Sequence, residues 1–230
     1  MPNGVRRPPT FPCRLPRIAT ADTPEYLVSY TLSKSLTTQN VPAVGGNRGR
    51  EVALSAFDVP HNVAISAGYE LPFGRGRRLL GTANGAVDAV LGGWQVQGIY
   101  VWRSGRPFTP TISSDRANTG VGNQRPNRIG SGQLNAPTVE LWFDKTAFVL
   151  PALFNYGNSG GGILREDSYK TLDFSLFKQF QIGNHRLQFR AEVFNLTNTP
   201  SFSAPNTAID TAAGGRVTSR RAVSDRGNSR

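Results

Sequence analysis

The stretch that decides the fold is "TLDFSLFKQFQIGNHRLQFRAEVFNLTN", which spans residues 171–198. Apolar and polar side chains alternate on both sides of the Gly183-Asn184 pair. The apolar positions are Leu172, Phe174, Leu176, Phe180 and Ile182 before it, and Leu187, Phe189, Ala191 and Val193 after it. An alternation of period two around a Gly-Asn turn predicts a β-hairpin with one apolar face. The alternation does not tell whether that face meets a protein core or lipid.

The same alternation recurs along the chain and predicts an all-β fold. The expected strands cover residues 25–37, 58–71, 93–105, 168–182, 186–197 and, more weakly, 216–223. The chain has 230 residues with 25 Gly, 16 Pro and 10% aromatic residues, a composition typical of strands and turns. The best helix candidate, residues 81–91, is interrupted by glycine. We therefore expect an antiparallel up-and-down meander of about six long strands.

The lengths of the connections favour a membrane barrel over a sandwich. If successive strands alternate in direction, the long segments 38–57, 106–167 and 198–215 all fall at one end of the sheet. The shorter segment 72–92 and the tight turn fall at the other end. Outer-membrane barrels have long outer loops and short periplasmic turns, whereas a sandwich has no reason to sort its loops in this way. A soluble all-β binding module, such as a lectin-like sandwich, remains the alternative.

Two tryptophans give a further indication of a membrane span. Trp94 and Trp102 lie eight residues apart on one face of the third expected strand. They are thus separated by roughly 26 Å along the strand, at about 3.3 Å per residue. At a tilt of about 40° this corresponds to about 20 Å, close to the spacing of two aromatic girdles around an apolar band.

The charge of the chain is concentrated at its ends. The formal net charge is +11, to which residues 1–23 contribute four arginines against Asp22 and residues 216–230 five arginines against Asp225. The body between them carries only the remaining +4, an ordinary value for its length, which argues against a nucleic-acid partner. The "FGRGRR" run at residues 73–78 is better explained as a basic turn than as a nucleic-acid patch, since no second patch accompanies it.

No residue combination predicts an active site, so we expect a protein that is not an enzyme and holds no cofactor or metal. Cys13 is the only cysteine, and His61 and His185 are the only histidines. The carboxylates Asp115, Glu166 and Asp167 lie in expected loops without the spacing of a calcium loop. Catalytic, cofactor-binding and metal-binding residues are therefore predicted to be none. The N-terminal residues lack the apolar run of a secretory signal peptide.

Several phrases of the sequence resemble the C-terminal barrel region of TonB-dependent receptors of the Oar-like type, which follows a carboxypeptidase-regulatory-like domain and a plug. The phrases are "YTLSKSL", "DVPHNVAISAGYELPFGRGRR", "LGGWQVQGIYVWRSGRPFTP", "WFDKTAFVLP", "YGNSGGGILRED", "YKTLDFSLFKQFQI" and "RLQFRAEVFNLTNTPSFSAPN". The resemblance covers residues 25–210. It implies an outer-membrane β-barrel of a Gram-negative bacterium that takes up a solute and is driven by the inner-membrane TonB energy-coupling complex.

The resemblance also has gaps. Nothing corresponds to the plug or to a terminal strand ending in an aromatic residue, and about six strands do not close a large barrel. We therefore expect a fragment, a barrel-wall segment that does not function alone. Its expected parts are a disordered basic, Pro-rich lead-in (1–23), a partial barrel (24–215) and a weak strand or disordered basic tail (216–230).

In this partial barrel the apolar face is expected to contact outer-membrane lipid, and the polar face to line the lumen. Lys178 breaks the apolar parity. Such a charge costs of order 0–1 kcal/mol near the membrane boundary but about 2–4 kcal/mol at the midplane. Leu172, Phe174, Leu176, Leu187, Phe189 and Val193 are assigned to the lipid face, and Asp173, Arg190 and Glu192 to the lumen face.

Overall fold

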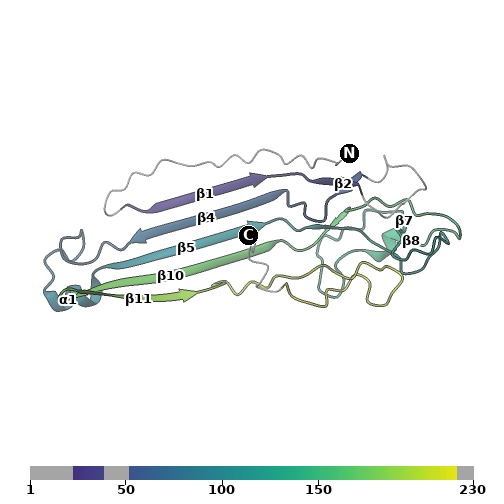
Figure 1. Cartoon of the computed structure of the whole chain (residues 1–230). Helices are drawn as coiled ribbons and strands as arrows, with labels where there is room; N and C mark the ends of the chain where they lie inside the picture. Colours follow the sequence, from purple (N-terminus) through teal and green to yellow (C-terminus); the bar gives the residue numbers. More distant parts are fainter. Residues whose placement is uncertain (1–22, 39–51, 222–230) are drawn as a thin grey trace.

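The computed structural model describes residues 23–38 and 52–221. Its main feature is one five-stranded antiparallel sheet (Figure 1). The strands are β1 (Glu25–Leu32), β4 (His61–Glu70), β5 (Trp94–Arg103), β10 (Tyr169–Ile182) and β11 (His185–Val193). They lie side by side in chain order, β1-β4-β5-β10-β11, so the predicted up-and-down meander is confirmed. The sheet is open, since β1 and β11 do not pair with each other.

The predicted hairpin is the β10–β11 pair, whose register runs from Phe174 opposite Val193 to Ile182 opposite His185. Gly183 has a φ of 58°, and Asn184 is not among the residues with positive φ. A positive φ at the first central residue is what a two-residue type II′ turn requires, and glycine adopts it without steric cost. The Gly-Asn pair thus fixes the register that aligns the apolar positions of both strands.

The register aligns the apolar side chains of all five strands on one face, which we call the apolar face. On the central strand, for example, Tyr100 lies between Ile65 of β4 and Leu172 of β10. Much of this face is open: Tyr26 is 62% exposed and Leu187 is 57% exposed. The polar face carries mainly Ser, Thr, Gln, Asn and charged residues. The apolar face comprises Tyr26, Val28, Tyr30, Val63, Ile65, Ala67, Tyr69, Trp94, Val96, Tyr100, Trp102, Leu172, Phe174, Leu176, Phe180, Leu187, Phe189, Ala191 and Val193.

The short connections lie at one end of the sheet, as the sequence predicts. Helix α1 (Gly85–Leu91) lies there beside the β10–β11 turn (Figure 1). It forms within the turn-rich segment because Asn84 caps its start, accepting from the Val87 amide at 2.9 Å. The Gly92 amide closes its end by donating to the Asp88 carbonyl at 2.8 Å. The helix candidate is thus real, although only seven residues long.

The long segments gather at the other end and form a compact unit, here called the loop cap (residues 104–167 and 198–221). It contains the pairs β6 (Pro107–Phe108) with β9 (Leu164–Arg165) and β7 (Asn127–Arg128) with β8 (Phe148–Val149), and the short helix η2 (Lys145–Ala147). Beside it, β2 (Leu36–Thr38) pairs with β3 (Val52–Leu54). The hydrophobic core of the loop cap consists of Phe108, Phe143, Ala147, Phe148 and Leu164, all at most 8% exposed.

A partly buried ion pair ties the loop cap to the sheet. Asp58, just before β4, is 1% exposed and binds Arg165 of β9, with 2.9 Å between Oδ2 and the guanidinium. The other carboxylate oxygen accepts from the Ser35 amide at 2.7 Å, and Arg165 also donates to the Gly105 carbonyl at 2.9 Å. These bonds hold the exit of β1, the start of β4 and the exit of β5 against the loop cap.

The expected sixth strand at 216–223 is wrong over its described part. Residues 216–221 run through the loop cap, where Val217 is 7% exposed and its amide donates to the Val139 carbonyl at 2.8 Å. Only an isolated bridge, Phe202 to Arg220, has strand character. The valine is therefore apolar because it packs in the cap, not because it alternates in a strand. The lead-in (1–22) and the tail (222–230) lie outside the described residues.

Two other strands end earlier than expected. The segment 25–37 breaks at Ser33–Ser35, because Ser33 and Ser35 donate to residues before β4 instead of continuing the ladder. The segment 186–197 ends at Val193, because Asn195 and Asn198 adopt positive φ values of 51° and 48°. Asparagine tolerates this conformation better than most residues, which favours a turn there.

Candidate functional site

A row of stacked rings crosses the apolar face at the end nearest the loop cap. Tyr30 of β1, His61 of β4 and Trp102 of β5 stack in sequence, with ring centroids 6.2 and 6.3 Å apart. The Tyr30 hydroxyl and His61 Nδ1 are hydrogen-bonded at 2.9 Å. His61 is thus part of an aromatic row. Amphipathic rings in such a row suit a membrane–water boundary, where one edge is apolar and the other wet.

A second aromatic cluster lies on the same face near α1. Trp94 packs edge-on against Phe189, with centroids 6.2 Å apart. Lys178 lies between them in the register and is 2% exposed. Its ammonium is 5.1 Å from the Trp94 ring centroid and 4.9 Å from that of Phe180, and it donates to the Gly92 carbonyl at the end of α1.

This geometry explains why a lysine occupies an apolar position. Lys178 lies eight residues from Lys170, which faces Trp102 at the opposite boundary, so it is at the edge of the apolar face and not in its middle. Its charge is directed at a helix-terminal carbonyl, and Asp88 interacts with it electrostatically. The parity predicted from the sequence therefore holds despite this residue.

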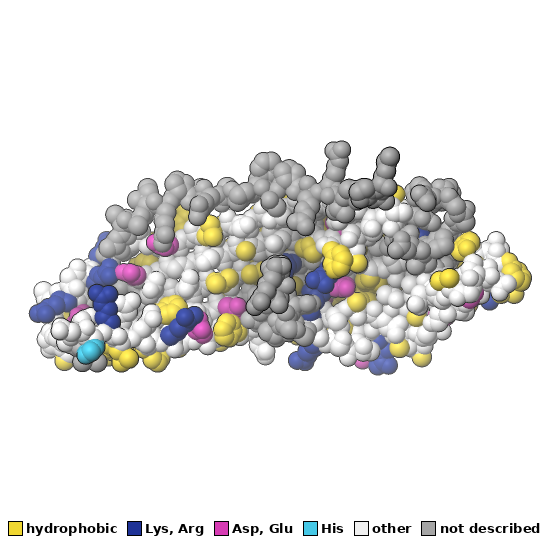
Figure 2. All heavy atoms as spheres, in the orientation of Figure 1, with side chains coloured by type: hydrophobic (Ala, Val, Ile, Leu, Met, Phe, Trp, Pro, Cys, Tyr) yellow, Lys and Arg dark blue, Asp and Glu magenta, His cyan; other side chains and the backbone are white. Residues whose placement is uncertain are grey.

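The polar face carries the charges that the sequence assigns to it. Asp173, Arg190 and Glu192 lie opposite the apolar face by register. Arg190 pairs with Glu192 at 2.5 Å and lies over the Phe177 ring, 5.2 Å from its centroid. Figure 2 shows one side of the molecule, on which charged side chains of both signs lie among uncharged polar surface and hydrophobic ones are scattered.

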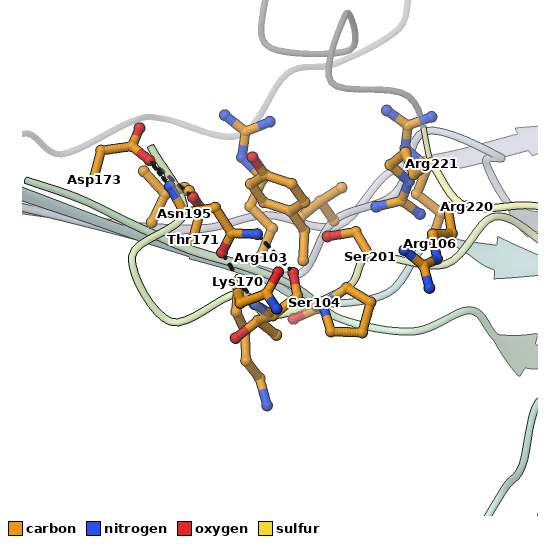
Figure 3. Close-up of a pocket in the computed structure, with 16 residues that line it drawn as sticks. Arg103, Ser104, Arg106, Lys170, Thr171, Asp173, Asn195, Ser201, Arg220 and Arg221 are labelled. Carbon is orange, nitrogen blue, oxygen red and sulfur yellow. Dashed lines mark hydrogen bonds between the residues drawn. The ribbon is translucent and has the colours of Figure 1, made fainter. Parts of the chain in front are cut away.

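A pocket of about 700 Å³ opens on the polar face where β5 and β10 meet the loop cap (Figure 3). The strands contribute Val101, Arg103, Tyr169, Thr171 and Asp173. The turn after β11 and the end of the loop cap supply Asn195, Asn198, Thr199, Pro200, Ser201, Arg220 and Arg221. The pocket therefore joins segments that are far apart in the sequence.

The turn that forms one wall of the pocket is fixed by Asp173. The Asn195 amide donates to Asp173 Oδ1 at 2.8 Å, and the Thr171 hydroxyl donates to the same oxygen at 3.2 Å. The Asn195 side chain in turn bonds the backbone of Thr199 in both directions, at 3.1 Å each. The Asp173 carboxylate thus holds in place the turn that forms this wall of the pocket.

A second carboxylate, that of Glu166, lies next to two arginines that line the pocket, Arg221 and Arg106. Glu166 binds Arg221 at 2.6 Å, with both side chains at most 15% exposed. Partial burial raises the pKa of the Glu166 carboxyl, and the charges of Arg221 and Arg106 oppose that rise. Burial also raises the pKa of Asp167. The sequence marked both carboxylates only as loop residues.

The remaining residues weighed in the sequence are scattered. Asp115 accepts from the amides of Thr119 and Gly120 at 3.1 and 2.6 Å, which lowers the pKa of its carboxyl and makes it the anchor of a turn. His185 starts β11 at the far end from the pocket. Within residues 23–38 and 52–221, no group of three or more His, Cys, Asp or Glu side chains is placed to hold a metal ion.

Sequence reasoning missed the basic pocket. Arg103 lies within the third expected strand, on its polar parity, and the sequence pattern places Arg220 and Arg221 in the last expected strand or the tail. A parity argument could have placed Arg103 on the polar face near the long loops. Nothing in the sequence brings Arg220 and Arg221 beside it, because that requires the fold of the loop cap.

Comparison with known proteins identifies the family. A family model described as an outer membrane beta barrel domain matches residues 20–227. Searches of curated proteins and of solved structures found no match. No helix of the described residues is long and apolar enough to cross a membrane. Since the family match spans most of the chain and agrees with the all-β sheet, the chain belongs to the outer membrane β-barrel domain family.

Proposed function

We propose that the chain forms barrel wall and outer loops of a TonB-dependent receptor of the Oar-like type, which takes up a solute across the outer membrane. The observation that carries the wall role is the apolar face with an aromatic row or cluster near each end. The receptor type rests on the resemblance of residues 25–210 to the barrel region of that family. In this role, further strands and a plug complete the barrel, and the inner-membrane coupling complex drives uptake.

The rival function, a soluble binding module with a sandwich fold, is less well supported. A sandwich needs a second layer against the apolar face, about 10 Å away. The described loops instead gather at one end of the sheet around their own core, and Tyr26, Leu187 and Phe189 stay 47% exposed or more. An exposed apolar face of this extent suits lipid better than water.

The wall role can be tested with single cysteines in cells that produce the whole receptor, in a Cys13→Ser background. The matched pairs are Asp173→Cys with Phe174→Cys, and Arg190→Cys with Phe189→Cys. A membrane-impermeant thiol reagent should label positions 173 and 190 and leave 174 and 189 unlabelled. Labelling of 174 and 189 in preference to their neighbours would contradict the assignment of faces.

The energy coupling needs a separate test. Intact cells should accumulate the transported solute only while the inner membrane holds a proton gradient. A protonophore should therefore stop accumulation without releasing the receptor from the outer membrane. Accumulation that continues at the same rate after the gradient has collapsed would indicate a passive channel instead of a TonB-dependent receptor.

A further inference from the structure

The pocket on the polar face is strongly basic. Four arginines line it, namely Arg103, Arg106, Arg220 and Arg221, and its one carboxylate is Asp173. Figure 3 shows Arg106, Arg220 and Arg221 clustered at one end of the pocket, with Asp173 and Asn195 at the other. Lys170 points to the opposite side of the sheet, as its parity requires. The arginines therefore create a positive end within a single cavity.

The carboxylates near the pocket offset only part of this positive charge, since Glu166 is paired with Arg221 and also interacts electrostatically with Arg106. Asp173 accepts hydrogen bonds from Asn195 and Thr171, and Glu166 is paired with Arg221. Within the described part of the chain, Arg103, Arg106 and Arg220 form no ion pair with a carboxylate. Arg103 lies over the Tyr169 ring instead, 6.0 Å from its centroid. At least three guanidinium groups thus keep their capacity to bind an anion.

The other lining residues indicate which uncharged groups a ligand would carry besides its anionic ones. Ser104, Ser201, Asn198 and Thr199 present hydroxyl and amide groups, while Tyr169 and Pro200 add apolar surface. A volume of about 700 Å³ lies within the range of small-molecule sites. Guanidinium groups bind carboxylate and phosphate groups through paired hydrogen bonds, and a concave basic wall concentrates anions.

We infer that this pocket is a binding site for a small solute that carries two or more carboxylate or phosphate groups. The inference rests on the proposed function insofar as the polar face lines a lumen open to the outside. The anionic groups bind Arg106, Arg220 and Arg103, and the uncharged part of the solute lies against Tyr169 and the Ser and Asn side chains. The site thus selects for charge at the entrance to the barrel.

The test measures binding by calorimetry to the protein purified from outer membranes in detergent, with citrate and pyrophosphate as probes. At least one probe should bind in the millimolar range or tighter, and uncharged trehalose should not compete. Loss of one charge-assisted contact should weaken binding about tenfold in Arg106→Gln and in Arg220→Gln. Binding should weaken further in the double variant and fall as the salt concentration rises.

A control variant makes the result specific. Arg190→Gln removes a cation from the same face outside the pocket and should bind as the parent does. Failure of both probes to bind, or equal loss in this control, would overturn the inference. The cysteine labelling above is unaffected by either outcome, so failure of the site and failure of the wall role are distinguishable.

Discussion

Lys178 shows how a charged side chain is tolerated on a face that meets lipid. Its stem packs between Trp94 and Phe189, and its ammonium reaches the Gly92 carbonyl at the end of α1. Long cationic side chains at membrane boundaries place their charge in the same way, at the polar edge. The position along β10, more than the residue type, thus decides whether a lysine is acceptable.

This depth dependence predicts losses of stability of different size for two matched substitutions. Phe174 lies halfway between the Trp102 and Trp94 rows, whereas Phe180 lies beyond the Trp94 row. Phe174→Lys should lower the free energy of unfolding in vesicles by about 2–4 kcal/mol. In Phe180→Lys, the charge of the new lysine should lower that free energy by only about 0–1 kcal/mol. Urea unfolding followed by tryptophan fluorescence measures both. Equal losses would mean that β10 does not cross a bilayer in this register.

Glu166 predicts a pH dependence of stability. Because burial raises the pKa of this carboxyl, the folded state holds the proton more tightly than the unfolded state does. Its contribution to stability is full below the ordinary glutamate pKa of about 4.3 and is lost as the pH rises through the folded pKa. Relative to the parent, Glu166→Gln should therefore become more stable as the pH increases from about 4 to 7.

Asp210 provides a control of opposite sign in the same loop cap. Burial acts to raise the pKa of Asp210, but its carboxylate accepts from the amides of Ser113 and Ser114 at 2.9 and 3.3 Å, and these and its other hydrogen bonds together lower that pKa. Its contribution is therefore lost as the pH falls through that lowered value, and Asp210→Asn should remove it. The measurement is the denaturant midpoint of each variant minus that of the parent, followed as a function of pH. If this difference changes with pH in the same direction for both variants, the directions assigned to the pKa shifts of Glu166 and Asp210 are wrong.

At the scale of elements, the loop cap is the only part of the described chain with a buried hydrophobic cluster. Phe143 is at its centre, 1% exposed, with ring centroids 5.6 Å from Phe108 and 6.1 Å from Phe148. Trp142 packs against the same cluster and donates its indole N–H to the Arg165 carbonyl at 3.0 Å. The cap thus has its own packing and its own fluorescent reporter.

Removing the central ring should therefore unfold the cap before the sheet. Phe143→Ala should cost about 3–5 kcal/mol of cap stability, seen as an earlier transition of Trp142 emission in a Trp94→Phe, Trp102→Phe background. Phe154→Ala is the matched control, since Phe154 is 73% exposed, and it should cost about 0.5 kcal/mol or less. A single transition that shifts equally in both variants would show that the cap has no separate stability.

The sheet could be predicted from the sequence, and the loop cap could not. Alternation of period two is set by the pleat of each strand, so the positions of Phe174, Tyr100 and Ile65 fix their common face locally. The cap depends on contacts between distant segments, such as Thr111 with Thr207 and Trp142 with Gly215. No periodicity records such contacts, and for this reason the sequence pattern places both Val217 and Arg221 in a weak strand or basic tail.

At the scale of the whole molecule, five strands form one open layer with an apolar face, a polar face and a cap at one end (Figure 1). An open edge presents unpaired N–H and C=O groups, which a bilayer does not solvate. We therefore expect β1 and β11 to pair with further strands in the membrane. Produced by itself, the described sheet should aggregate in buffer; a cooperative monomer without detergent would favour the soluble module.

The central claim, that the apolar face contacts lipid, is tested most directly by the three tryptophans. Trp94 and Trp102 lie on that face near its two boundaries, whereas Trp142 packs in the loop cap. The measurement is fluorescence quenching of single-tryptophan variants, with the other two changed to Phe, reconstituted in vesicles of brominated lipid. Brominated chains should quench Trp94 and Trp102 strongly and leave Trp142 bright. Quenching of Trp142 equal to that of the other two, or no quenching of Trp94 and Trp102 in folded protein, would contradict the account.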